Sequence, residues 1–408
     1  MRKSPQRSFA VVMTVMTALL AVGFVIVHML YNMTYASDSL VMLREAIYTQ
    51  VHGTMSEKYR WYFQTYPHNM GLEVLWIYIL NLTGTWKAVE VTGSLMVVLA
   101  ILFASLTVRN VTHSAWASVL TFGIAAFYVG TCYHSLMPYT HNYGILFPVL
   151  CLYVYTGRLG FYKKCFLLIV IAAVGSEIKM TTLIPFIAIA MTESVRWLRS
   201  RNIRYAIYAV AVSAMCFGTM SILRQSLWEN VGYKEDKTLA VTLPYFLAMG
   251  QCTETVGHFD NYCYSLNKMR RGTPRKETDR MFCRLACRRV AERGLGGNLA
   301  FWGKKISRTW GDASMLDHGR SFSNPIMKVI GVGYTATRQM LMWAFYILII
   351  CALPVMLKKR YGIVVCLSLA GVFLYQLLFE AQSHYIYMFS PLLVLAACVS
   401  VVWVKERY

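Results

Sequence analysis

Long apolar blocks separated by short basic clusters are the feature that most constrains this chain. The first block, FAVVMTVMTALLAVGFVIVHML, follows MRKSPQR. Its length of about 22 residues matches the thickness of a bilayer and exceeds the apolar core of a signal peptide. Hydrophobic residues make up 57% of the sequence and charged residues only 14%. This pattern indicates an integral membrane protein.

We predict an all-α polytopic fold with about ten transmembrane helices, in a range of about nine to twelve. Blocks long enough to cross lie near residues 9–30, 88–108, 114–132, 142–157, 164–178, 180–196, 205–222, 337–357, 361–379 and 385–404. The block at 71–84, GLEVLWIYILNLTG, is shorter. We expect it to lie at the outer surface or to dip into the bilayer, with Trp76 and Tyr78 as interface anchors.

Basic residues at the ends of the blocks predict the orientation. With the N-terminus inside, the cytoplasmic side receives Arg109, Arg158, Lys163, Lys164, the RWLRSRNIR cluster, KKR at 358–360 and the final KER. Both termini are then cytoplasmic, in a multi-pass protein of the plasma membrane. The formal net charge of +21 follows from this topology, so we expect no nucleic-acid partner.

Two outer segments divide the chain. The first outer loop covers residues 31–87 and is expected to carry amphipathic helices. A large extracytoplasmic insertion, residues 223–335, precedes the last three spans. Residues 1–222 then form an N-terminal transmembrane catalytic module, and residues 336–408 form the C-terminal helices.

Four cysteines share the insertion, in a compartment where thiols can oxidise: Cys252, Cys263, Cys283 and Cys287. The i, i+4 spacing of the last two on a predicted helix disfavours a bridge between them, and the pairing stays open. The close cysteine pairs of most zinc sites are missing from this set, so no metal is expected.

Charged groups at the outer ends of the spans are the candidate functional residues, because they are costly there unless they are paired or used. Asp38 follows the first span, where it can serve as a general base or cap the helix that begins near SDSL. Lys179 lies between two apolar blocks in GSEIKMTTLIP. It suits a phosphate, although a pair with Glu177 or snorkelling to the interface would also explain it. YPHN at 66–69 fits a turn, and single histidines fit structural roles as well as catalytic ones.

The order of several motifs resembles the polytopic glycosyltransferases of the C superfamily, above all bacterial members similar to dolichyl-phosphate-mannose-protein mannosyltransferases. The motifs are YFQTYPHNMGLEVLW, PYTHNYG, GSEIKMTTLIP and FEAQSHYIYMFSPLLVLA, with LPYFLAMGQ, GHFDNY and FWGKKISRTWGD in the insertion. They span nearly the whole chain, and all are expected on the outer face.

The resemblance implies an enzyme that transfers a sugar, with inversion, from a polyprenyl-phosphate donor to an extracytoplasmic acceptor. The expected partners are this donor, a glycan, lipid or protein acceptor, and membrane lipids. By position, Asp38 becomes the base, and Lys179 holds the donor phosphate. No cofactor is obligatory, because a phosphate leaving group needs only a cation nearby.

Further site residues follow from the same resemblance. Donor-phosphate contacts are expected from His384 and Tyr385, and contacts with the acceptor from the loop cations Lys305 and Arg320. The pocket is expected to contain Glu45, Tyr66, Pro67, His68, Asn69 and His141.

Two histidines depart from the family pattern. His141 stands where relatives tend to carry an acid, and His384 where they tend to carry an arginine. Histidine is only partly charged at neutral pH, so donor binding would lean more on Lys179 and the loop cations.

Three alternatives stay open. The same outer cations would serve a transporter or flippase of lipid-linked sugars, although the chain lacks the paired halves common in transporters. The basic insertion and His384 would also suit a polysaccharide polymerase or ligase. A scaffold that has lost catalysis would fit the two histidine departures.

Overall fold

The computed structural model describes residues 5–30, 37–207, 210, 227–313, 325–382 and 384–406. Within these ranges all regular structure is helical. The predicted all-α class is therefore confirmed for the described part of the chain.

Four helices are long and apolar enough to cross a membrane. They are α1 (Pro5–Leu30), α5 (Trp86–Thr112), α16 (Arg360–Leu378) and the Gly333–Met356 part of α15 (Pro325–Met356). The helices α6 (Ala115–Tyr128) and α18 (Ser390–Lys405) are apolar but shorter.

Helices also form at the other predicted blocks that the structure describes. They are α8 (Leu146–Thr156), α9 (Phe161–Ile178) and α10 (Ile184–Ser200). Most of the predicted span at 205–222 lies outside the described residues. The total number of spans stays a prediction.

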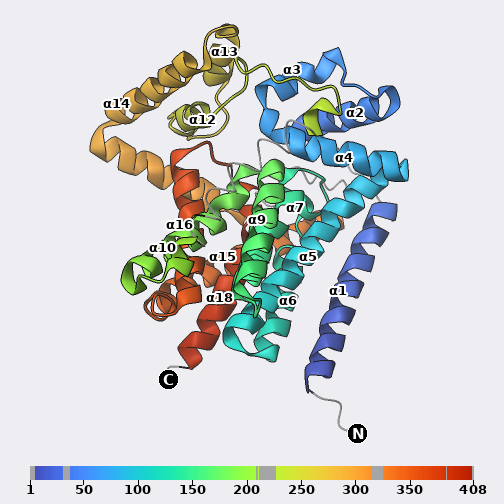
Figure 1. The fold of residues 1–408 in the computed structure, drawn as a ribbon, viewed down its shortest axis with the longest axis vertical. Helices are drawn as coiled ribbons and strands as arrows, with labels where there is room; N and C mark the ends of the chain where they lie inside the picture. The colour runs from blue at the N-terminus through green and yellow to red at the C-terminus, as the bar shows by residue number, and fades with distance from the viewer. Residues whose placement is uncertain are drawn as a thin grey trace.

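Helices of the two outer segments gather at the same end of the molecule (Figure 1). From the first outer loop come α2 (Ser37–His52), α3 (Glu57–Thr65) and α4 (Met70–Thr83). From the insertion come α12 (Leu243–Gly250), α13 (Asn261–Met269) and α14 (Arg275–Trp310). The start of α1 and the end of α18 lie at the opposite end (Figure 1). We call these the loop end and the basic end.

Contacts at the basic end join the predicted positive clusters to the chain ends. The guanidinium of Arg109 lies 3.7 Å from the centre of the Phe9 ring. The ammonium of Lys359 lies 2.9 Å from a carboxylate oxygen of Glu406. The first and last helices therefore share this end with two of the predicted basic clusters.

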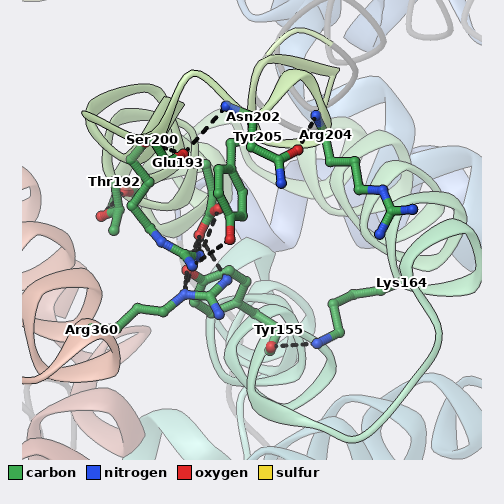
Figure 2. Close-up of polar contacts among 11 residues, drawn as sticks. Tyr155, Lys164, Thr192, Glu193, Ser200, Asn202, Arg204, Tyr205 and Arg360 are labelled. Carbon is green, nitrogen blue, oxygen red and sulfur yellow. Dashed lines mark hydrogen bonds and ion pairs between the residues drawn. The ribbon is translucent and has the colours of Figure 1, made fainter. Parts of the chain in front are cut away.

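A buried carboxylate also organises this end (Figure 2). Glu193, 1% exposed, accepts hydrogen bonds from Arg360 at 2.8 Å, from Arg196 at 3.1 Å and from the Tyr155 hydroxyl. Lys164 donates to the carbonyl oxygen of Tyr155 at 2.9 Å. Because a buried charge needs partners, this cluster holds α8, α10 and α16 together.

The short block at 71–84 forms α4, which lies across longer helices at the loop end (Figure 1). Tyr78 is 44% exposed, as an interface anchor would be, but Trp76 is fully buried. The indole of Trp76 packs edge to face on Trp86, with ring centres 5.1 Å apart. The prediction that Trp76 is an interface anchor is therefore wrong: this side chain belongs to the core.

The insertion is joined to the spans by a lysine clamp. Lys305 of α14, 1% exposed, donates to the carbonyl oxygens of Phe379 at 2.6 Å, Gly250 at 2.7 Å and Leu377 at 3.1 Å. The last carbonyls of a helix have no partner within it. The ammonium satisfies these groups at the ends of α12 and α16.

Backbone pairing extends this joint. The amide of Glu380 donates to the carbonyl of Phe246 at 2.9 Å, and the amide of Ala381 donates to the carbonyl of Gly257 at 3.0 Å. The insertion thus fixes the path of residues 377–381 just before α17 (His384–Tyr387).

Gly250→Ala should loosen this joint. A Cβ atom on Gly250 would overlap the carbonyl group of Phe379, which is backbone and cannot rotate away. We expect a loss of about 1–3 kcal/mol, measured as a lower unfolding temperature in detergent. Gly296→Ala in α14 is the control, since its Cβ atom would meet nothing within 4 Å. Equal unfolding temperatures for the two variants would contradict the close packing.

Candidate functional site

Polar side chains from five distant segments form one cluster at the loop end. The segments are residue 38, residues 62–69, residues 139–141, residue 179 and residues 380–385. Contacts link residue 38, residues 139–141, residue 179 and residues 384–385, and the charges of Asp38 and Glu380 act on Tyr66.

Asp38 lies in the first turn of α2, where unpaired amides and the helix dipole favour a negative charge. The Tyr139 hydroxyl donates to Oδ2 of Asp38 at 3.0 Å, across 101 residues of sequence. Both side chains are partly exposed. The carboxylate is therefore oriented by a neighbour and is not fully buried.

Lys179 follows α9 with an extended backbone, at φ −162° and ψ 121°. Its Nζ atom lies 2.8 Å from Nε2 of His141 and 4.6 Å from the centre of the Tyr385 ring. Burial and the nearby Lys179 cation lower the pKa of His141 well below its ordinary value. His141 is thus neutral at physiological pH and accepts a hydrogen bond from Lys179.

Lys179 and Glu380 both have pKa values moved toward neutrality. Burial lowers the pKa of Lys179 to about 7, and the Glu380 carboxylate opposes this change. Burial raises the pKa of Glu380 to about 6. A hydrogen bond from Gln382 at 3.2 Å and the cations Lys179 and Lys305 oppose that rise. The site therefore contains a cation and a carboxylate that titrate near neutral pH.

Aromatic rings surround the lysine. His141 stacks on Tyr385 with ring centres 5.3 Å apart and meets His384 edge to face at 4.9 Å. His134 lies 5.4 Å from His384 between ring centres. These contacts bring Tyr385, His141 and His384 together in the cluster that contains Lys179.

Residues 66–69 contact the insertion. The rings of Tyr66 and His68 meet edge to face with centres 5.9 Å apart, and His68 meets Phe246 of α12 in the same way at 5.7 Å. Negative charge on Asp38 and on Glu380 both help raise the pKa of Tyr66, after the larger effect of burial. Tyr66 therefore lies where the first outer loop meets the insertion.

The other residues of the segment 66–69 have structural roles. Pro67–Asn69 form the short helix η1, in which Pro67 and Asn69 are buried. The amide of Asn69 donates to the Tyr62 hydroxyl at 2.7 Å, and Tyr62 is 2% exposed. The predicted turn is thus a helical turn that fixes a buried tyrosine.

Glu45 does not have its expected place in the pocket. It is fully buried, and its carboxylate accepts hydrogen bonds from the amide of Ser56 at 2.6 Å, from the Ser56 hydroxyl and from Thr49 at 3.4 Å. Ser56 is the N-cap of α3. The prediction is corrected accordingly: Glu45 positions the start of α3.

Of the two expected acceptor cations, the structure describes only Lys305, which differs from its prediction. The ammonium of Lys305 is bound by three backbone carbonyls and is buried, so it is a clamp and not an acceptor contact. Arg320 lies outside the described residues.

The four insertion cysteines are free thiols in this structure, with Cys252 and Cys263 buried and Cys283 and Cys287 exposed. No group of three or more His, Cys, Asp or Glu side chains able to hold a metal occurs among the described residues.

A shallow open hollow of about 520 Å³ lies between α3 and the turn at 232–237. Most of the residues that line it are polar or charged, with both signs present: Arg60, Gln64, Gly232, Lys234, Glu235, Asp236 and Lys237. Such a lining offers hydrogen-bond donors and acceptors to a hydroxyl-rich molecule.

Two residues of the cluster received no role from the sequence. Glu380 and Tyr139 stood inside the motifs FEAQSHY and PYTHNYG, which were the only signal for them. Glu380 gains its importance from Lys179, and Tyr139 from Asp38. Those partners are distant in the sequence.

The amine of Lys179 should titrate near neutral pH. We expect its acetylation rate in the purified protein, followed by peptide mass spectrometry, to rise through a pKa of about 7, against about 10.4 for an ordinary lysine. Glu380→Gln removes an opposing negative charge and should move this pKa lower still. An ordinary lysine titration in the unsubstituted protein would contradict the described burial.

Comparison with known proteins supports the membrane assignment. None of the curated proteins compared with the chain matches it. A family model described as a conserved hypothetical integral membrane protein matches residues 3–323, well over half of the chain. The chain therefore belongs to this family and is an integral membrane protein.

Proposed function

We propose that this protein transfers a sugar from a polyprenyl-phosphate donor to an extracytoplasmic acceptor. One observation carries the proposal: the carboxylate of Asp38 and the ammonium of Lys179 belong to one polar cluster at the ends of membrane helices. A lipid-linked donor keeps its tail in the bilayer and presents its phosphate and sugar at this level.

Asp38 acts as the general base. It takes the proton of the acceptor hydroxyl as that oxygen attacks the anomeric carbon. The new carbon–oxygen bond forms while the bond to the phosphate oxygen breaks, and polyprenyl phosphate leaves with the bonding electrons. The hydroxyl of Tyr139, 3.0 Å from Asp38, keeps the carboxylate in one orientation.

Lys179 holds the donor phosphate. In the described structure its ammonium contacts the neutral ring of His141. A phosphate offers a charged acceptor, and a nearby anion favours the protonated form of the lysine. His384 and Tyr385 lie beside this position and supply further donors. A cation on the leaving group is what this chemistry requires.

The insertion forms part of the acceptor site. The hollow between α3 and residues 232–237 is polar, open and made by the first outer loop and the insertion together. In this proposal the loop end faces outward from the plasma membrane, and both termini lie in the cytoplasm.

Asp38→Asn should reduce sugar transfer about 10²–10⁴-fold, the usual contribution of a general base. The substitution keeps the shape of the side chain and removes the base. The assay follows label from polyprenyl-phosphate sugars into envelope fractions, with purified protein in nanodiscs. Glu57→Gln is the control, because Glu57 is an exposed acid of the same loop. Full transfer by Asp38→Asn would exclude this mechanism, and binding without transfer by the unsubstituted protein would favour a flippase.

Transfer should also fall as pH rises through the pKa of Lys179, about 7. The sign follows from the lowered pKa, since the ammonium loses its proton in this range and with it the charge that holds phosphate. The kcat/KM profile for the donor reports this free-enzyme group. Lys179→Arg keeps the charge, so its profile should be flat above pH 7. Lys163→Met, at an exposed lysine of the basic end, should change nothing. If kcat/KM for the donor still falls with rising pH in Lys179→Arg, the group that titrates is not Lys179.

A further inference from the structure

α14 consists of two halves that differ in their surroundings. Gly294, at φ 61° and ψ −176°, breaks the helical backbone and kinks the helix. The first half extends away from the spanning helices, and the second half returns toward the outer end of α16 (Figure 1). The second half, residues 295–310, is the segment of interest.

An exposed apolar stripe runs along this second half. Leu295 is 79% exposed and Leu299 is 61% exposed, while Trp302 and Ile306 are partly exposed. Their spacing of four, three and four residues places all four on one helix face. Exposing several large apolar side chains to water to this extent is unfavourable, so the stripe indicates a binding partner.

The stripe is held at the level of a membrane boundary. The buried face of the same segment includes Lys305, which donates to the carbonyls of Leu377 and Phe379 at the end of α16. α16 is one of the four candidate spans, and its last turns expose Leu374 at 53% and Leu378 at 43%. The stripe therefore belongs to a segment that is joined to the end of a candidate span, whose last turns also expose apolar side chains.

Cations lie on the other flank of the buried face. Lys304 and Arg308 are exposed and, at 100° per residue, point about half a turn away from the stripe. A helix with an apolar face and cations on its opposite, polar face is typical of one that lies in the plane of a membrane interface. Charge and apolar surface together favour a bilayer with anionic headgroups as the partner.

We propose that residues 295–310 form an interfacial helix, with Leu295 and Leu299 inserted in the outer leaflet and Lys304 and Arg308 at anionic headgroups. This inference does not depend on the proposed transferase activity. Because Lys305 belongs to the same helix, docking on lipid also fixes the position of residues 377–381 beside the candidate site.

The test places the photoreactive residue benzoylphenylalanine at position 299 of the full chain in nanodiscs of phosphatidylglycerol and phosphatidylethanolamine. After irradiation, intact-mass spectrometry counts covalent lipid adducts. Position 280, exposed on the first half of α14, is the matched control. We expect several-fold more lipid adducts at 299 than at 280. Equal adducts at both positions, or crosslinks to a second copy of the chain, would overturn the proposal.

Two further variants complete the test: a second probe position on the stripe and a double substitution that reverses the charge of the cations. Position 295 is a second probe on the same stripe if the change at 299 impairs folding, which the unfolding temperature reports. Lys304→Glu combined with Arg308→Glu should abolish the preference of position 299 for phosphatidylglycerol over phosphatidylethanolamine. If position 299 still prefers phosphatidylglycerol in this double variant, the proposal that Lys304 and Arg308 bind anionic headgroups is refuted.

Discussion

The ammonium of Lys305 is the interaction on which the loop end depends. It joins three carbonyls at the ends of α12 and α16, where the helices themselves supply no partner. A buried cation is costly unless donors and acceptors are well placed, so this joint tolerates few alternatives. Through it, the insertion determines where Glu380 and the helix that begins at His384 lie.

Burial sets the chemistry of the candidate site. Lys179 and Glu380 share a region poor in water, and each opposes the effect of burial on the other. The result is a lysine that loses its proton near neutrality and a carboxylate that takes one up slightly below it. His141 stays neutral in the same surroundings and accepts a hydrogen bond from the lysine.

Local patterns predicted the helices well and the roles of single side chains less well. Asp38, Lys179, His141, His384 and Tyr385 were chosen from motifs, and the structure brings them into one cluster. Glu45, Lys305 and Trp76 were assigned from their position along the chain, and their partners prove to be buried backbone or core groups. Periodicity cannot show such partners, because they belong to distant segments.

The sequence by itself determined that this protein lies in a lipid bilayer. Apolar blocks of bilayer length require lipid and helices, and clustered cations predict which end stays inside. Only the tertiary structure decided which groups surround each of two similar lysines. Lys305 meets backbone carbonyls, while Lys179 meets a neutral imidazole and an aromatic ring. The physical reason is that the availability of a charge depends on the groups packed around it, and packing joins residues that the sequence keeps far apart.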